Sequence, residues 1–337
     1  MQVAYWTSAM HPDMEAVASE VALLRKHFFP SVSWGISADR WLQLSWRRGF
    51  GVHPRLQLAF RATTWALQRT ARINHLFGSG GDWFHLRALH SHPALLTATT
   101  QAALCNRAML AKIDHFVVEW PGARESLQTE GIPASQMDLI FPPVDVHRFF
   151  PSNMPAGPLR VLFASSPGRP EWLEARGIPL LLEVAQRLPD VRFRLLWRPW
   201  GTAYGQVLQE LRQRELSNVE LYCHCQADMA IAYREAHVTI APFTDAARCK
   251  AVPNSLLESL ASGRPVILTD ISGIAELVQE EGGGIVCPPQ VEALCAAVQR
   301  SQGELVQLAA AARRTAEKWF SAEHFLRSYQ RLYAPWW

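Results

Sequence analysis

The sequence has no run of about 18 consecutive apolar residues, the length that a helix needs to cross a bilayer. Its first residues, MQVAYWTSAM, lack the basic segment and apolar run of a secretory signal, so we expect a cytoplasmic protein. Net charge is also small, because 33 Lys and Arg stand against 30 Asp and Glu, for a formal charge of +3. This balance argues against a general nucleic-acid-binding protein, which needs a strongly basic domain.

Cysteine is scarce and scattered, with six residues in the chain, so a disulfide framework is excluded. Cys223-His224-Cys225 has no second ligand pair at the spacing of a zinc site, and we expect reduced thiols and no bound metal. Asp-x-Asp metal motifs are absent as well, and neither a Ser-His-Asp nor a Cys-His arrangement stands out.

The 337 residues, 49% of them hydrophobic, are enough for two domains, each with its own core. Short β-rich runs alternate with helical periodicity, which predicts parallel sheets covered by helices on both faces. The expected strands are 3–6, 73–77, 94–98, 115–119 and 137–141, followed by 159–165, 191–197, 219–222, 237–241, 265–269 and 284–287. Helices are expected at 13–27, 55–71, 101–111 and 121–130.

The domain boundary is predicted at a proline-rich segment, residues 141–158, which holds five Pro. Proline interrupts both helices and sheet ladders, so this segment reads as a linker. We expect one domain over 1–150 and a second over 151–318, with a ligand cleft between them, followed by a helical segment over 319–337.

The segment 249–278 carries the densest chemical signal. Asn254 or Ser255 can cap the helix that follows Pro253, and a helix N-terminus is a favourable place for a phosphate. Glu258 lies one turn inside this helix, where its carboxylate could accept hydrogen bonds from hydroxyl groups. An ordinary α/β unit with a solvated Glu is the alternative interpretation of the same pattern.

This segment resembles the donor-binding core of glycosyltransferase family 4, a retaining family. The matching features are Asn254-Ser255, Glu258, Gly263, Pro265-Val266 and Gly273-Ile274-Ala275-Glu276. Further segments that resemble family elements, in the same order, are 131–149, 165–189, 228–243 and 282–289. The resemblance implies an α/β protein of GT-B fold, with two Rossmann-like doubly wound domains facing each other across a cleft. It also implies that the N-terminal domain, 1–150, binds the acceptor, that the C-terminal domain, 151–318, binds the nucleotide sugar, and that the helix over 319–337 crosses back to the first domain.

The resemblance also implies roles for single residues. Glu258 stands where the family binds the ribose hydroxyls, and Asn254 and Ser255 stand where backbone N–H groups meet the diphosphate or the sugar. Arg169 and Arg176 stand where the family keeps an Arg and a Lys, two cations that would neutralise the leaving nucleotide. Further candidates for nucleotide contacts are Ser166, Arg198, Trp200 and His224.

Two departures from the family pattern concern the sugar. The family's first Glu stands eight residues before the second one, and Lys250 occupies that position here. This cation could meet a phosphate or an acidic sugar, and we include it among the catalytic candidates. The family's His in the first domain is also replaced, by Thr99-Thr100, while His85, His90 and His92 lie just upstream; His92 and His85 are the preferred pair.

The expected function is transfer of a sugar, a hexose by resemblance, from a nucleotide-diphosphate sugar to an acceptor hydroxyl with retention and without a metal or resident cofactor. The acceptor hydroxyl would be oriented beside the leaving phosphate oxygen, which can itself take the proton. Alternatives are a catalytically degenerate homologue that only binds a nucleotide sugar, and a nucleotide-sugar epimerase of the same fold.

Residues 34–75 form a basic and aromatic segment. They contain seven Arg and a single acid, Asp39, for a net charge of +6, interleaved with Trp34, Trp41, Trp46 and Trp65. Arginine with aromatic residues suits an anionic membrane surface or a phosphorylated acceptor. The family resemblance allows a carbohydrate, a lipid-linked or a small-molecule acceptor. Buried tryptophans with solvated arginines are the alternative interpretation.

Overall fold

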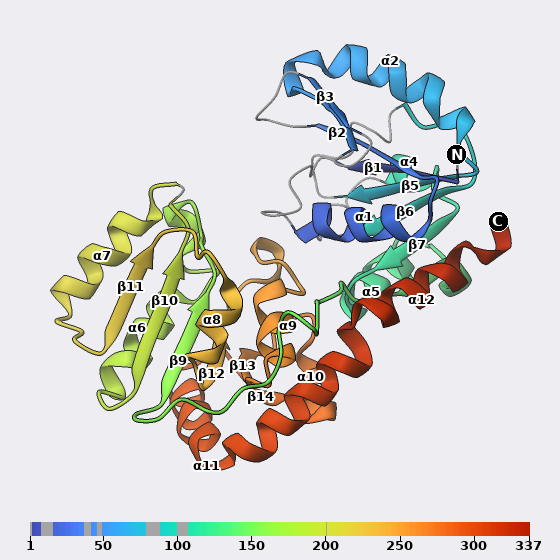
Figure 1. The fold of residues 1–337 in the computed structure, drawn as a ribbon. Coiled ribbons are helices and arrows are strands. Elements are labelled where there is room, and N and C mark those ends of the chain that lie inside the picture. Colours follow the sequence, from blue (N-terminus) through green and yellow to red (C-terminus); the bar gives the residue numbers. More distant parts are fainter. Residues whose placement is uncertain are drawn as a thin grey trace. The chain divides into compact units, whose positions relative to one another are not determined.

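The computed structural model describes residues 2–7, 16–36, 42–45, 49–78, 88–99, 107–199 and 201–337. The chain divides into two compact units (Figure 1). The first unit combines residues 1–142 with 323–337, and the second unit contains residues 143–322. The proline-rich linker therefore belongs to the second unit from Pro143 onward. No described helix is long and apolar enough to cross a membrane.

The first unit is built on an eight-stranded sheet of order β3-β4-β2-β1-β5-β6-β7-β8, in which the β3–β4 pair alone is antiparallel. Its strands are β1 (Val3–Thr7), β2 (Val32–Ile36), β3 (Leu42–Ser45), β4 (Gly49–Val52), β5 (Ile73–Gly78), β6 (Ala94–Ala98), β7 (His115–Val118) and β8 (Met137–Leu139). Its described helices are α1 (Ala16–His27), α2 (Gln57–Leu67), α4 (Arg107–Leu110), α5 (Pro121–Thr129) and α12 (Ala322–Tyr333).

Helix α12, from the far end of the sequence, completes the core of the first unit. Phe325, Tyr329 and Tyr333 are buried among residues of α1, β1, β5 and β6. The hydroxyls of Tyr329 and Tyr333 join a buried polar chain. Thr97 Oγ1 lies 2.9 Å from the Tyr329 hydroxyl and 2.8 Å from Nε2 of His75, whose Nδ1 lies 2.5 Å from the Tyr333 hydroxyl. Burial lowers the pKa of His75 to about 3, so this chain is made of neutral groups.

The second unit is built on a six-stranded parallel sheet of order β11-β10-β9-β12-β13-β14. Its strands are β9 (Arg160–Ala164), β10 (Arg192–Trp197), β11 (Val219–Cys223), β12 (Val238–Ala241), β13 (Val266–Thr269) and β14 (Gly284–Cys287). Its helices are α6 (Ile178–Arg187), α7 (Ala203–Gln213), α8 (Met229–Arg234), α9 (Asn254–Ala261), α10 (Ala275–Glu281) and α11 (Val291–Thr315).

The strand order of the second unit reverses between β9 and β12. The chain first moves outward from β9 to β11, and then returns to β12 and continues in the opposite direction. Right-handed crossovers place the helices of these two halves on opposite faces of the sheet. Loops therefore diverge at the carboxyl ends of β9 and β12, and such a switch point is where open α/β sheets bind ligands.

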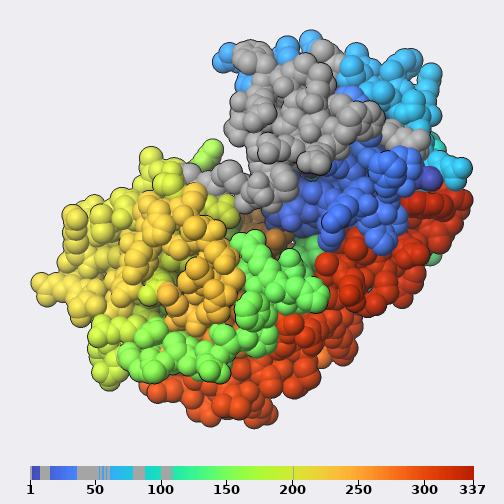
Figure 2. Space-filling view, viewed as in Figure 1, coloured from blue at the N-terminus to red at the C-terminus, as the bar shows by residue number. Residues whose placement is uncertain are grey.

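Arg264, a fully buried cation, fixes the linker to the second unit. Its guanidinium donates to the backbone oxygens of Ser152, Asn153 and Arg234, and also to the Ser152 hydroxyl. The positive charge is thus solvated by carbonyl dipoles in place of water. In the space-filling view the green linker lies against the orange-yellow surface of α8 (Figure 2).

The predicted α/β class is confirmed, and every predicted strand is present with ends within two residues. Strands β2, β3 and β4 were missed. Of the predicted helices, 55–71 and 121–130 correspond to α2 and α5. Residues 13–15 and 101–106, at the starts of the other two, lie outside the described residues. The long C-terminal helical segment is α11 and α12, joined by a π-helical turn over Ala316–Phe320.

Candidate functional site

Loops at the carboxyl edge of the second sheet pack closely together. The loop after β10 reaches the loop after β9 through the Thr202 amide, which donates to the Gly168 oxygen at 2.9 Å. At Gly201, where φ is +73°, an added Cβ would lie 1.8 Å from that same oxygen, so this contact requires glycine. The loop after β12 joins them through the Thr244 amide, which donates to the Ala175 oxygen at 3.0 Å.

Glu258 lies on α9, the helix that follows β12 at the switch point. Its Oε2 accepts a hydrogen bond of 2.8 Å from the Tyr233 hydroxyl on α8, and its side chain remains partly exposed. Enclosure by protein raises the pKa of this carboxyl from 4.5 to about 7; the Tyr233 hydrogen bond and the charges of Arg148 and Arg198 act in the opposite direction. A carboxylate with this environment can accept hydroxyl donors from a ligand.

The N-terminus of α9 presents Asn254 and Ser255. Pro253 occupies the N-cap position and supplies no side-chain cap, so the first helical N–H groups have no intrahelical acceptor. Lys250 Nζ donates to Asn254 Oδ1 at 3.2 Å, which places a cation beside this first turn. Three candidates from the sequence, Lys250, Asn254 and Ser255, therefore lie together. The Lys250 charge and the partial positive charge of the α9 N-terminus both favour an anion at this place.

The two candidate arginines differ in how firmly they are held. Arg176 is half-buried, its Nη1 donates to Ser165 Oγ at 3.3 Å, and its guanidinium lies over the Phe243 ring. Arg169 is exposed, 3.7 Å from Glu171, and stacks on the similarly exposed Trp172. Arg176 is thus a preorganised cation beside the switch point, whereas Arg169 is partly neutralised on the surface.

Ser166, Arg198 and His224 follow three neighbouring strands, β9, β10 and β11, at the same edge of the sheet. Ser166 Oγ accepts a hydrogen bond of 2.9 Å from the Arg198 amide, which ties the first two loops together. His224 is exposed, and its Nε2 lies 2.9 Å from Gln226 Nε2. It follows β11, the outermost strand on one side of the sheet. Trp200 lies outside the described residues.

His92 stands at the wrong edge of its sheet for the role expected of it. It precedes β6, so it lies at the amino end of that strand, and its Nδ1 is 2.7 Å from Asp114 Oδ2. Asp114 also accepts a hydrogen bond from the Ala94 amide, which makes this ion pair an anchor for the start of β6. Parallel sheets bind ligands at the carboxyl ends of their strands, so a sugar contact by His92 does not fit this position. His85 lies outside the described residues.

Sequence reasoning missed three residues that complete the site: Tyr233, Arg148 and Phe243. No motif in the sequence singles out Tyr233, one of the apolar residues of α8, or Arg148, which lies in the proline-rich segment 141–158. Arg148 Nη2 lies 3.2 Å from Asp228 Oδ1 at the N-cap of α8, and its charge acts on Glu258. The place of Tyr233 on the helix just before β12 was the one signal in the sequence that could have pointed to it.

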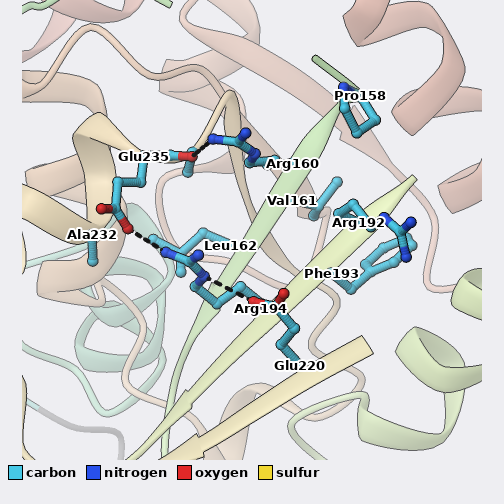
Figure 3. A pocket seen from close by; sticks show the side chains of 11 residues that line it. Pro158, Arg160, Val161, Leu162, Arg192, Phe193, Arg194, Glu220, Ala232 and Glu235 are labelled. Atoms are coloured by element: carbon cyan, nitrogen blue, oxygen red, sulfur yellow. Dashed lines mark hydrogen bonds and ion pairs between the residues drawn. The ribbon is translucent and has the colours of Figure 1, made fainter. Parts of the chain in front are cut away.

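A cavity of about 400 Å³ lies elsewhere, over the first halves of β9 and β10 (Figure 3). Arg194 crosses it and pairs with Glu235 and, at 3.4 Å, with Glu220. The Tyr222 hydroxyl donates to that same Glu220 at 3.0 Å. Arg194 is therefore paired with both glutamates of this cavity, and none of the candidate residues lines it.

Comparison with known proteins places this site in a family context. Residues 160–302 match the family model described as "Glycosyl transferases group 1". This range contains Arg169, Arg176, Lys250 and Glu258. WcaL of Escherichia coli K12, named as a colanic acid biosynthesis glycosyltransferase, is 25% identical over 218 residues, which are 60% of this chain and 52% of WcaL. The chain thus spans about half the length of that curated relative.

Solved structures match the whole chain. Sucrose-phosphate synthase from Thermosynechococcus elongatus superposes with a TM-score of 0.81 at 18% identity, with 99% of each chain covered. HepE from Anabaena, solved with UDP, gives 0.78 at 13% identity over 99% of this chain and 100% of that one. The chain has the GT-B fold. Its two sheets are the two Rossmann-like halves of that fold.

Proposed function

We propose that this GT-B protein is a retaining, metal-independent glycosyltransferase of family 4 that moves a hexose from a nucleoside-diphosphate sugar to an acceptor hydroxyl. The observation that carries the proposal is the grouping of Glu258, Arg176 and the α9 N-terminus at the switch point of the second sheet. A hydroxyl-binding carboxylate and an anion-binding helix end are the two features that a ribose diphosphate requires.

The residues would divide the work as follows. Glu258 accepts the ribose hydroxyls, and the amides of Asn254 and Ser255 face the diphosphate. Arg176 offsets the negative charge that grows on the leaving nucleotide when the sugar–phosphate bond breaks. The acceptor hydroxyl attacks the sugar carbon, and its proton passes to the departing phosphate oxygen, so no protein base is needed.

Lys250 is a candidate determinant of which sugar the donor contains. It stands where the family has its first Glu, and its Nζ lies 3.2 Å from Asn254 Oδ1. A cation at this position favours a sugar with a carboxylate, or an additional phosphate contact. Turnover of UDP-glucuronate and UDP-glucose by the wild type and by Lys250→Glu tests this: the variant should shift the ratio toward the neutral sugar, and an unchanged ratio would rule out the contact.

The solved relatives suggest the chemistry of the donor and acceptor. HepE was solved with UDP, with UDP and glucose, and with UDP-glucose. WaaB, a lipopolysaccharide outer core galactosyltransferase, has a TM-score of 0.74 at 13% identity, with 99% of this chain and 100% of that one covered. A nucleotide sugar as donor, and a carbohydrate or lipid-linked saccharide as acceptor, are therefore the first substrates to test.

The function is tested by a thermal-shift screen of UDP, GDP, ADP and dTDP sugars, followed by transfer and hydrolysis assays on each ligand that binds. Transfer or hydrolysis with release of the nucleoside diphosphate supports the proposal. Binding without release would identify the catalytically degenerate homologue, and interconversion of two nucleotide sugars would identify the epimerase. Absence of any binding would contradict all three.

We further propose that the first unit attaches to an anionic membrane surface from the cytoplasmic side. Leu58 and Trp65 of α2 are exposed by 76% and 51%, and Arg69 lies over the Trp65 ring. Arginine beside exposed apolar side chains suits the interface of an anionic bilayer. Trp41 and Trp46 of the same segment are not described. Pelleting with phosphatidylglycerol vesicles should fall for Leu58→Ser/Trp65→Ser, but not for Val306→Ser, an equally exposed apolar residue of α11.

A further inference from the structure

Tyr233 is the direct partner of Glu258. The Tyr233 side chain is fully buried, and its hydroxyl donates to Glu258 Oε2 at 2.8 Å from a neighbouring helix 25 residues away in sequence. A buried phenol needs a hydrogen-bond acceptor, and this carboxylate is the acceptor that the structure provides. One oxygen of Glu258 is therefore held by the protein, while Oε1 has no hydrogen-bond partner among the described residues.

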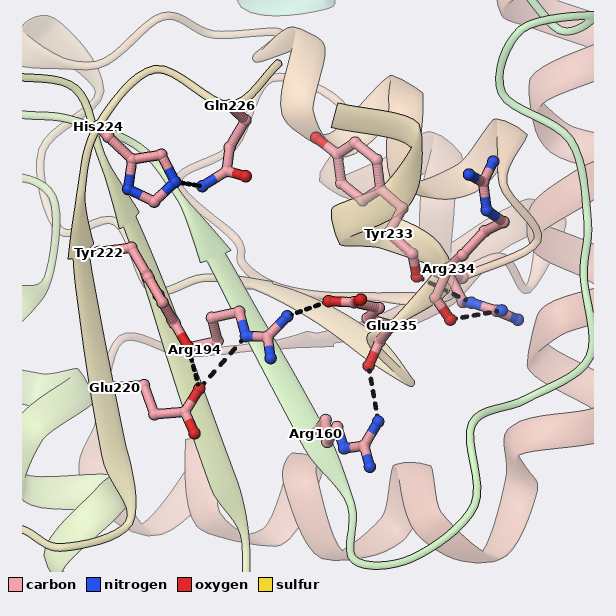
Figure 4. A network of polar contacts seen from close by, with 10 residues as sticks. Arg160, Arg194, Glu220, Tyr222, His224, Gln226, Tyr233, Arg234 and Glu235 are labelled. Carbon is pink, nitrogen blue, oxygen red and sulfur yellow. Dashed lines mark hydrogen bonds and ion pairs between the residues drawn. The ribbon is translucent and has the colours of Figure 1, made fainter. Parts of the chain in front are cut away.

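Tyr233 is itself held from several directions. Its backbone oxygen accepts a hydrogen bond of 3.1 Å from Nε of the buried Arg264, and the edge of its ring meets the Phe149 ring at 5.9 Å between centroids. Figure 4 shows Tyr233 on α8, with its backbone oxygen engaged on the side away from the ring. A hydroxyl positioned this rigidly can orient its partner with little entropic cost.

Some groups around Glu258 favour its ionised form, and others disfavour it. Arg148 from the linker and Arg198 from the loop after β10 favour the carboxylate, and Asp228 at the start of α8 disfavours it. Tyr233 adds a neutral donor that favours the ionised form, whereas enclosure by protein is the largest opposing effect. Because these effects leave the carboxyl with a pKa of about 7, loss of one donor changes its ionisation at neutral pH.

We propose that Tyr233 is a positioning residue for nucleotide binding, whose hydroxyl keeps the carboxyl group of Glu258 ionised and turned so that it can accept two ribose hydroxyls. This inference rests on the proposed function, because it assigns a ribose to Glu258. A protonated carboxyl has one acceptor oxygen fewer for the pair of hydroxyls, so nucleotide affinity should follow the ionisation of Glu258.

The consequence is a pH profile that a purely structural role would not produce. In Tyr233→Phe the ring still fills its site, but the pKa of Glu258 rises further because a donor to the ionised form is lost. If the rise is about one pKa unit, affinity should fall about tenfold at pH 5.5, about fivefold at pH 7 and less than twofold at pH 8.5. A packing defect alone would weaken binding by the same factor at every pH.

Titration calorimetry with UDP-glucose, GDP-mannose and ADP-glucose over this range of pH tests the inference, because the diphosphate esters of these donors do not titrate there. The matched control is Tyr222→Phe, which removes a hydroxyl that donates to Glu220 at 3.0 Å outside the site. We expect wild-type affinity to fall below about pH 7, the fall to move to higher pH in Tyr233→Phe alone, and Glu258→Gln to bind weakly without this dependence.

The possible results separate the inference from the proposed function. Failure of the wild type to bind any of the donors would overturn the proposed function and the inference with it. Binding by the wild type with no fall below pH 7, or a Tyr233→Phe profile parallel to that of the wild type, would overturn the inference alone. The wild-type profile needs no variant, so a Tyr233→Phe protein that failed to fold would still leave a decisive measurement.

Discussion

Gly177 packs directly against the backbone of Pro242, so that an added Cβ would lie 1.7 Å from the Pro242 carbonyl oxygen. Gly177 has a φ of +68° and precedes α6, while Pro242 follows β12, so the contact joins the two loops of the switch point. Arg176 is the residue before Gly177. The position of the candidate cation therefore depends on a contact that only glycine permits.

Gly177→Ala should destabilise the protein by at least about 1–2 kcal/mol and reduce donor turnover, because both the left-handed backbone and the Pro242 contact reject a methyl group. Gly205→Ala is the matched control: this glycine lies in α7 with open space around it, and alanine there should be neutral or stabilising by about 0.5–1 kcal/mol. Urea unfolding measures both. Equal effects at the two sites would contradict the importance of the contact.

Arg176→Ala should lower turnover by about 10²–10³, the usual cost of removing a group that stabilises charge in the transition state. Arg176→Lys keeps the charge and should retain most of the activity. Arg169→Ala should cost less than tenfold, since its guanidinium is exposed beside Glu171. Initial rates of nucleotide release test the order, with Arg300→Ala on the exposed face of α11 as the control. A larger effect at Arg169 than at Arg176 would refute the assignment.

Glu258→Gln should become more stabilising as pH rises from about 5 to 8. Folding raises the pKa of Glu258 from 4.5 to about 7, so the folded protein binds a proton at this carboxyl more tightly than the unfolded chain does. As pH rises through this window, the wild-type carboxyl becomes charged in the folded state, and this charge lowers the free energy of unfolding. Gln stays neutral and avoids that loss. The gain should increase by about 2–3 kcal/mol between pH 5 and pH 8. Thermal unfolding at several pH values measures it, against Glu280→Gln on the surface; a gain independent of pH would contradict the raised pKa.

Phe325→Ala should destabilise the first unit by about 3–5 kcal/mol, because Phe325 is 2% exposed and belongs to the core that α12 shares with β1 and β5. Val306 of α11 is 84% exposed, so Val306→Ala should change the free energy of unfolding by less than about 0.5 kcal/mol. Native-state hydrogen exchange would locate the loss: faster exchange in β1 and β5 is expected, and unchanged exchange there would contradict the packing of α12.

Much of the fold was readable from the sequence because fully buried parallel strands are continuous apolar runs. VAYWT of β1 and VILT of β13 are buried along their whole length and could be assigned at once. Strands β3 and β4 were missed because they are four residues long, lie at one side of the sheet and include Gly49 and Gly51, which have low strand propensity. Strand β2, VSWGI, contains Val, Trp and Ile and was missed although its residues favour a strand. Their pairing depends on tertiary contacts that a local pattern does not contain.

The site residues that are close together in the sequence could be predicted, whereas those contributed by distant segments could not. Lys250, Asn254, Ser255 and Glu258 lie within nine residues, and a helix start brings them together. The hydrogen bond from Tyr233 and the charge of Arg148 reach Glu258 from distant segments, so no local spacing could reveal them. His92 precedes the strand predicted at 94–98, so its place at the amino end of that strand was readable from the sequence, but its contact with Asp114, 22 residues away, was not.

The central claim is that Glu258 binds the nucleotide of a sugar donor that this protein turns over. The most direct measurement is the rate of nucleoside-diphosphate release from the best donor by the wild type and by Glu258→Ala, with Glu280→Ala as a surface control. We predict that Glu258→Ala loses at least about tenfold in kcat/KM, equivalent to about 1.4 kcal/mol, while the control is unchanged. Turnover by Glu258→Ala at the wild-type rate would contradict the account.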